Sequence, residues 1–210
     1  MLTKPLTYEE YKKIKKGNFS GRLTASFPTN YEVISRLITD GFLKFEGDML
    51  NVYDVGVGSG KGAIQLSQNL IEAGIEHCIH AVDKRRSQLS TVLGSNFIQK
   101  DLSKLNLLLG DITQRKLENL ADLTIGLKVI SSRDDIQTFS HIMFDNLIHG
   151  TKVGGYIITA NIDPDENKYG IINNSFPGSV IFDNCNIQIY KKILEKKVFD
   201  FPIPSFERVE

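Results

Sequence analysis

From residue 51 onward, apolar positions change repeatedly between the alternating pattern of strands and the roughly 3.6-residue period of helices. The β-type run Asn51–Val55 precedes a helical stripe over Lys61–Ala73, which Gly74 closes. Further strands are predicted at His77–Val82, Leu105–Leu109, Asp122–Leu127 and Gly155–Ala160, and further helices at Arg85–Phe97 and Asp135–Leu147. Leu105–Leu109, with four leucines, is expected to be buried on both faces. The alternation predicts an α/β fold with a doubly wound, mostly parallel sheet.

The C-terminal pattern is less regular. Ser179–Phe182 and Ile187–Ile193 predict an antiparallel hairpin around residues 183–186. A helix over residues 187–197 is the alternative. The hairpin is favoured because isoleucines alternate with polar residues in the second segment.

Residues 1–50 precede the alternation and are interpreted as a helical lead-in to an α/β domain of residues 51–210, the two forming one compact domain. Helices are predicted at Tyr8–Lys16 and Tyr31–Phe42. The segment between them, NFSGRLTASFPTN, is rich in turn formers but too apolar for a solvated tail. It is expected to be a lid over the carboxyl edge of the sheet, with a strap across the back of the sheet as the alternative.

Composition narrows the class of protein. The 210 residues are 41% hydrophobic and 24% charged, and 25 basic residues balance 25 acidic ones. A neutral chain has no general electrostatic preference for nucleic acid or an anionic membrane. Cys78 and Cys185 are isolated, which suggests neither a disulfide framework nor a metal site. With no membrane-length apolar run and no signal-peptide core at the start, a cytoplasmic protein is expected, of an oligomeric state left open.

The segment VYDVGVGSGKG carries the candidate chemistry. A strand runs into Gly56, Gly58, Gly60 and Gly62, and a helix follows at once. Glycines allow a tight turn and a close approach of ligand to the main chain, while a helix N-terminus presents unpaired N–H groups. The loop is therefore expected to bind an anionic group, either a phosphate or a carboxylate.

Two phosphate-binding loops can be compared with this segment. A P-loop does not fit, because Val55 stands where its first glycine belongs and Gly62 where its Ser or Thr belongs. A dinucleotide-binding loop fits better: residues 58–63 contain G-x-G-x-x-A, and Asp83 ends the next strand where a ribose-binding acid belongs. That match alone leaves NAD(P) binding open.

The order Asp54-Val55-Gly56-Val57-Gly58-Ser59-Gly60 resembles the first motif of the class I S-adenosylmethionine-dependent methyltransferases, an acidic residue followed by alternating glycines. The resemblance implies a Rossmann-like methyltransferase fold whose loop holds the methionine end of S-adenosylmethionine. Asp54 would then face the amino or sulfonium side of that cofactor, directly or through water. A buried aspartate would repel a pyrophosphate, so Asp54 favours this interpretation over the dinucleotide one.

Later segments resemble the same family in the same order, over roughly residues 50–160. Asp83, in HAVDK, would accept hydrogen bonds from the ribose hydroxyls, although a turn or helix-cap acid is the alternative. In LLLGDI, Asp111 would accept from the adenine amino group and Ile112 would lie against the base. Residues 152–158 look like the family's turn into strand five. The implied cofactor-binding residues are Asp54, Gly56, Gly58, Gly60, Asp83, Lys84, Asp111, Ile112 and Leu127.

The resemblance implies methyl transfer to a small molecule or a protein side chain, with no metal. Displacement at a sulfonium is catalysed largely by positioning, so a general base is optional, and no catalytic residue is identified. Residues 126–132 lack the Asn-Pro-Pro-Tyr of amide and amine methylation. Lys128, Arg22 and Tyr31 are candidates for the acceptor pocket by position alone. The alternatives are a catalytically inactive methyltransferase-like partner module and an NAD(P)-binding domain.

Overall fold

The computed structural model describes residues 30–94, 102–127, 137–160, 171–173, 181–182, 185–195 and 206–209. The predicted helix Tyr8–Lys16, most of the proposed lid, Arg22 and Lys128 lie outside these residues. The helices are α2 (Asn30–Thr39), α3 (Lys61–Glu72), α4 (Arg86–Gly94), the short 3-10 helix η2 (Leu102–Lys104) and α5 (Gln137–Gly150). The strands are β1 (Leu50–Val55), β2 (His77–Asp83), β3 (Leu105–Leu109), β4 (Ala121–Gly126), β5 (Thr151–Ala160), β6 (Ile171–Asn173), β7 (Ile181–Phe182), β8 (Cys185–Lys192) and β9 (Glu207–Val209).

The described strands form a sheet in the order β6-β8-β5-β4-β1-β2-β3-β9, with β7 paired to β8. Strands β1 to β5 all run parallel to one another. At the two sides of this parallel set, β8 pairs antiparallel with β5, and β9 pairs antiparallel with β3. The chain first builds outward from β1 to β3 and then returns to β4 on the other side of β1. This confirms the predicted doubly wound, mostly parallel α/β fold and places its topological switch point between β1 and β4.

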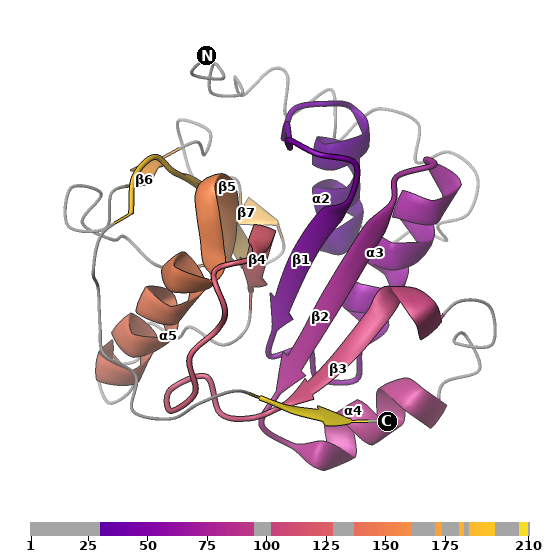
Figure 1. Ribbon diagram of the computed structural model, residues 1–210, viewed down its shortest axis with the longest axis vertical. Helices are drawn as coiled ribbons and strands as arrows, with labels where there is room; N and C mark the ends of the chain where they lie inside the picture. The colour runs from indigo at the N-terminus through magenta and orange to yellow at the C-terminus, as the bar shows by residue number, and fades with distance from the viewer. Residues whose placement is uncertain are drawn as a thin grey trace.

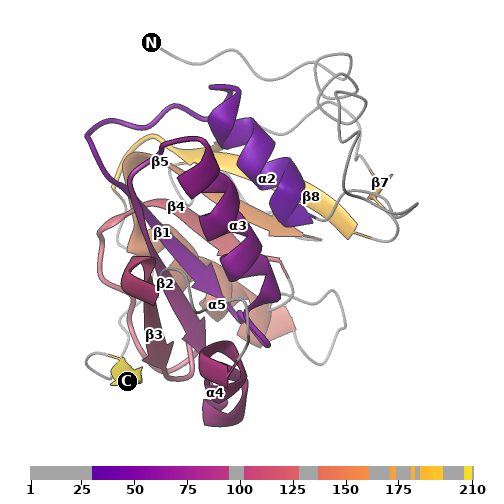
Figure 2. The same cartoon turned by 90° about the vertical axis from the view of Figure 1, so that its right-hand side faces the viewer.

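Helices cover both faces of the sheet. Helices α2, α3 and α4 lie on one face and α5 on the other (Figure 1). Their apolar side chains belong to two separate core clusters, one on each face. Figure 2 shows α2 and α3 side by side across the strands. Because side chains alternate along a strand, Val52 lies in the cluster under α2 and α3, and Tyr53 lies in the cluster under α5.

The helix predicted at Tyr31–Phe42 is α2, which ends earlier. Gly41 adopts a φ of 73°, and its amide donates to the Ile38 carbonyl at 3.0 Å. A glycine in the left-handed region whose amide makes this backward hydrogen bond is a standard helix C-terminus. The same arrangement at Gly74, whose amide donates to the Ile71 carbonyl at 3.0 Å, confirms the predicted end of α3.

The expectation that Leu105–Leu109 is buried on both faces is wrong. Leu107 is buried, but the other residues of β3 are only partly buried. The reason is position: β3 has just one neighbour of full length, β2, and its other side is paired by the three-residue β9, which the sequence did not predict.

The glycine pair expected to form the turn into strand five lies inside that strand. β5 begins at Thr151, directly after α5, and the pairing register with β4 shifts between Ala121 and Leu123. Gly154 has a φ of 89°, and a Cβ on Gly155 would lie 2.8 Å from the Asp122 carbonyl oxygen. The glycines therefore allow an irregular, close approach of two central strands.

The C-terminal hairpin is confirmed. Ile181 pairs with Asn186 and Phe182 with Cys185, and residues 187–192 are strand, not helix. β8 continues past the hairpin and pairs with both β5 and β6.

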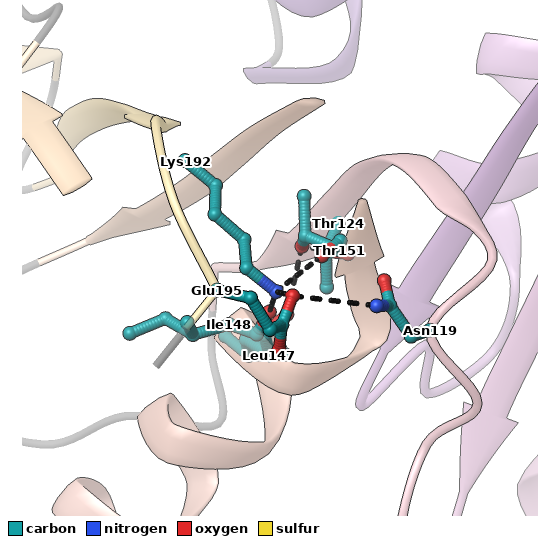
Figure 3. Close-up of polar contacts among 7 residues, drawn as sticks. All are labelled: Asn119, Thr124, Leu147, Ile148, Thr151, Lys192 and Glu195. Atoms are coloured by element: carbon teal, nitrogen blue, oxygen red, sulfur yellow. Dashed lines mark hydrogen bonds and ion pairs between the residues drawn. The ribbon is translucent and has the colours of Figure 1, made fainter. Parts of the chain in front are cut away.

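Lys192, at the end of β8, is fully buried at the C-terminus of α5 (Figure 3). Its Nζ donates to the carbonyl oxygens of Ile148 at 2.9 Å and Thr151 at 2.7 Å, and it lies 2.8 Å from the Glu195 carboxylate. The last carbonyls of a helix lack intrahelical partners and carry partial negative charge, which suits an ammonium. Burial lowers the pKa of Lys192, while Glu195 opposes that change. Lys192 thus joins β8 to the corner between α5 and β5.

We expect Lys192→Met to lower the free energy of unfolding by about 2–4 kcal/mol, because buried carbonyls would lose their donor. Urea unfolding followed by circular dichroism measures this. Lys116→Met, at an exposed position, is the matched control and should change stability little. Equal effects of the two substitutions would show that the buried ammonium does not support this corner.

Candidate functional site

The glycine loop leaves β1 at Val55 and turns back along the end of β2. The amides of Gly56 and Val57 both donate to the Val82 carbonyl, at 2.8 and 3.1 Å. Gly56, Gly58 and Gly60 have φ values of 71°, 57° and 75°. Residues other than glycine rarely adopt such φ values, so the backbone path itself requires glycine at these positions.

Helix α3 begins directly after the loop. Gly60 is its N-cap residue and supplies no side-chain hydrogen bond to the first turn. A Cβ on Gly60 would lie 2.4 Å from Val92, so the glycine also lets α4 approach closely. The first-turn amides of α3 are therefore uncapped by a side chain and lie at the carboxyl edge of the sheet.

Two cavities flank the glycine loop. The first, of about 410 Å³, lies on the β2 and β3 side. It is lined by Val55, Gly56, Gly58, Val82, Asp83, Lys84, Arg85, Gly110, Asp111, Ile112 and Met143. The second, of about 350 Å³, is lined by Asn30, Tyr31, Val55, Gly56, Val57, Gly58, Ser59, Lys61, Gly62, Gln65 and Leu127. Since Val55, Gly56 and Gly58 line both, the cavities form a cleft divided by the loop, where α/β sheets bind ligands.

Asp83 ties together the loops that form the first cavity. Its Oδ2 accepts from the Gly58 amide at 3.0 Å, and its Oδ1 accepts from the Arg85 amide at 2.9 Å. Its carbonyl oxygen accepts from the Gly110 amide at 3.0 Å. Asp83 is only 5% exposed but lines the cavity. Asp83 therefore stabilises the turns around it through hydrogen bonds and also lines the first cavity.

Asp111 also combines a turn contact with a place in the first cavity. Its Oδ1 accepts from the amide and the hydroxyl of Thr113 at 2.9 and 2.8 Å, and its Oδ2 lies 3.9 Å from Lys84 Nζ. The neighbouring Ile112 is 6% exposed and contributes an apolar wall.

The buried Asp54 and the partly buried Tyr31 form a pair beside the second cavity. Asp54 is 0% exposed, and its Oδ1 accepts from the Tyr31 hydroxyl at 2.8 Å. Its Oδ2 has no hydrogen-bond partner among the residues that the structure describes. Burial raises the pKa of Asp54 to about 7, although the hydrogen bond from Tyr31 lowers it. Burial and then the charge of Asp54 raise the pKa of Tyr31 well above its usual value. Tyr31 therefore keeps its proton at neutral pH, and the Asp54 carboxyl group changes charge near pH 7.

Gly62 explains how Tyr31 reaches this position. A Cβ on Gly62 would lie 2.2 Å from the Tyr31 ring. The glycine thus lets α2 pack tightly on the start of α3, so that the Tyr31 hydroxyl reaches the strand below.

Comparison with known proteins shows the fold. No family model and no curated protein sequence matches the chain. A Methanococcus maripaludis structure provisionally named an S-adenosyl-L-methionine-dependent methyltransferase matches 90% of this chain and 95% of its own, with 14% identity and a TM-score of 0.55. A Listeria monocytogenes structure, provisionally named a class I S-adenosylmethionine-dependent methyltransferase, matches 95% of this chain and 73% of its own, with 17% identity and a TM-score of 0.56.

The chain has the Rossmann-like fold of class I methyltransferases. It spans only 27% of a Haemonchus contortus phosphoethanolamine N-methyltransferase 2 that contains S-adenosyl-L-methionine, matching 60% of this chain with 19% identity and a TM-score of 0.46. It spans 45% of the [4+2]-cyclase SpnF, matching 62% of this chain with 13% identity and a TM-score of 0.46. These shorter matches carry no argument about this chain.

In this methyltransferase fold, the predicted site residues within the described ranges gather around one loop. Residues predicted from motifs at the ends of the neighbouring strands β2 and β3, Asp83 and Asp111, meet in the first cavity, and Leu127 lines the second with Tyr31. Sequence reasoning missed Met143 and Gln65 as lining residues. Neither has a local signal, because each reaches the cleft only through the packing of its helix.

Two further properties concern the described part of the chain. Within it, no group of three or more His, Cys, Asp or Glu side chains is placed to hold a metal ion. None of its helices is long and apolar enough to cross a membrane.

We expect the stability of Asp54→Asn relative to the natural chain to depend on pH. The pKa of Asp54 is about 7 in the folded chain and about 3.9 in the unfolded chain. Between these values the carboxyl is ionised in the unfolded chain but still protonated in the folded one, so the stability of the natural chain falls as the pH rises. Asparagine does not titrate. From pH 4 to pH 7 the variant should therefore gain up to about 4 kcal/mol relative to the natural chain. Urea unfolding across this range measures the difference, and a difference that stays flat would contradict a buried, poised carboxyl group.

Proposed function

We propose that the chain binds S-adenosylmethionine in the divided cleft and transfers its methyl group to a small molecule or a protein side chain. The observation that carries this proposal is the pair of cavities joined at the glycine loop, each with a buried aspartate beside it. The names of the Methanococcus and Listeria structures that share the fold support the same cofactor.

The first cavity fits a nucleoside. Each carboxylate oxygen of Asp83 accepts one backbone hydrogen bond and keeps a further lone pair, so it would accept from ribose hydroxyls. Ile112, Val82 and Met143 provide apolar surface for a base, and Asp111 lies at the same wall to accept from an amino group. Gly56 and Gly58 leave no side chain between the ligand and the loop backbone, and Lys84 stands at the rim.

The second cavity fits the amino-acid end of the cofactor. The uncapped first turn of α3 would accept its carboxylate through backbone N–H groups. Tyr31 lines the cavity and its hydroxyl joins Asp54, so Asp54 would act on the amino or sulfonium side through Tyr31. A dinucleotide would instead place a diphosphate beside this buried carboxylate, which disfavours NAD(P).

When bound, the cofactor supplies a methyl group on a sulfonium, a good leaving group for in-line displacement. The chain would contribute orientation: Asp83 fixes the ribose, α3 fixes the carboxylate, and Leu127 and Val57 form apolar walls that exclude water. Arg22 and Lys128 remain candidates for the acceptor pocket, predicted from the sequence alone. A partner module without activity would bind the same cofactor without transferring its methyl group.

We expect S-adenosylhomocysteine to stabilise the chain and NAD not to do so. Ligand at a hundred times its dissociation constant adds about 2.7 kcal/mol to the free energy of unfolding. Thermal unfolding with each ligand, followed by calorimetric titration, measures this. Equal stabilisation by NAD, or none by either ligand, would refute the proposed cofactor.

We expect Asp83→Ala to weaken S-adenosylhomocysteine binding by about 2–3 kcal/mol and to lower stability by about 1–3 kcal/mol, because ribose hydroxyls and two backbone amides lose their acceptor. Asp122→Ala is the matched control. Asp122 accepts from the Asn51 amide at 2.9 Å and from Lys152 at 3.1 Å, near the start of β4 at the opposite edge of the sheet. The control should lose stability but keep its affinity. Unchanged affinity in Asp83→Ala would make Asp83 a turn residue only.

A further inference from the structure

We propose that the Tyr31–Asp54 pair makes the chain distinguish the positively charged sulfonium cofactor from its neutral thioether product. The buried carboxylate of Asp54 would match the charge of the donor, and the product would lack that charge. The inference rests on the proposed binding of S-adenosylmethionine and names a specificity-determining pair within the same cleft.

The carboxylate of Asp54 is isolated from water and incompletely bonded. Asp54 is 0% exposed, and in the described part of the chain only the Tyr31 hydroxyl donates to it. Its neighbours in the sheet are Ala81 on β2 and Ile125 on β4, both apolar. A charge in such surroundings interacts strongly with any other charge nearby, because little solvent screens it.

Tyr31 joins this carboxylate to the cavity. Tyr31 lines the second cavity, whereas Asp54 lies behind it and is not among the lining residues. The hydroxyl donates to Asp54 and keeps lone pairs for a donor in the cavity. A change of charge in the cavity is therefore felt by Asp54 without direct contact.

The charged groups around Asp54 do not neutralise it. On α2, Arg36 pairs with Asp40, at 3.6 Å, and on α3, Lys61 is exposed at the cavity mouth. Tyr31 is the one described group whose hydrogen bond changes the pKa of Asp54, and burial is the larger effect. The carboxyl group consequently changes charge near neutral pH, at a pKa of about 7.

A sulfonium in the cavity favours the ionised carboxylate, so binding of S-adenosylmethionine releases a proton from Asp54 where binding of S-adenosylhomocysteine does not. At pH values below the pKa that Asp54 has with the sulfonium bound, the carboxyl is neutral in both complexes and offers no preference. The preference for the donor rises from there towards the pKa of about 7 of the free chain and is complete above it. After methyl transfer the attraction disappears, which favours exchange of product for fresh donor.

The test is calorimetric titration of the natural chain and Asp54→Asn with S-adenosylmethionine and S-adenosylhomocysteine between pH 6 and 8, in buffers of different ionisation enthalpy. We expect the ratio of the two dissociation constants to favour the donor increasingly with pH, by about tenfold for each unit by which the sulfonium lowers the pKa of Asp54. The ratio in Asp54→Asn should lack this component. Subtracting the variant cancels protons exchanged by the ligand's own amino group.

Tyr31→Phe provides a second, independent variant. Loss of its hydrogen bond should raise the pKa of Asp54 and move the onset of donor preference to higher pH, while Asp54 itself is kept. The same pH dependence in the natural chain and in Asp54→Asn, or an unmoved onset in Tyr31→Phe, would overturn the inference while leaving cofactor binding intact. Failure of both ligands to bind the natural chain would instead refute the proposed function.

Discussion

The cleft depends on the hydrogen bonds that converge on Asp83. One residue at the end of β2 accepts from the amides of Gly58, Arg85 and Gly110, which belong to the loops after β1, β2 and β3. Parallel strands bring these loops to one edge, and the main-chain carbonyl of Asp83 holds the loop after β3 there. The buried carboxylate of Asp83 fixes the loops after β1 and β2 relative to each other, and it leaves its remaining lone pairs at the wall of the cavity. The Asp83 side chain therefore both fixes loops of the site and provides the proposed contact with the ribose.

The pair of Tyr31 and Asp54 is the counterpart on the other side of the glycine loop. A carboxyl group with no exposure and one unpartnered oxygen costs folding free energy, and its raised pKa of about 7 expresses that cost. The chain accommodates the pair with Gly62, whose missing side chain admits the Tyr31 ring. Such a local cost is typical of functional sites, and it agrees with the proposed electrostatic role of Asp54 behind Tyr31. At the opposite edge Lys192 is also fully buried, but its ammonium is bonded to two carbonyls and a carboxylate and so serves the fold alone.

Much of the fold was predictable because its signals are local. The period of apolar residues defined β1, α3, β2 and β4, and Gly74 ends α3 through backbone geometry that only nearby residues determine. The prediction for β3 failed because burial depends on neighbours: a strand one place from the edge has the same composition as a central one. β9 was missed because three residues carry too little pattern, and it forms only by pairing with a strand about a hundred residues earlier.

The sequence alone determined the glycine loop and the acids that follow the strands, because their chemistry is tied to the ends of strands and those ends share one edge of a parallel sheet. Only the tertiary structure decided what each acid does there. Asp83 and Asp111 bond to nearby loop amides and line the same cavity, whereas Asp54 lies behind Tyr31, a residue 23 positions earlier on another element. Burial, and with it the charge state of Asp54, arises from the packing of α2 on α3 over β1, which no short stretch of sequence encodes.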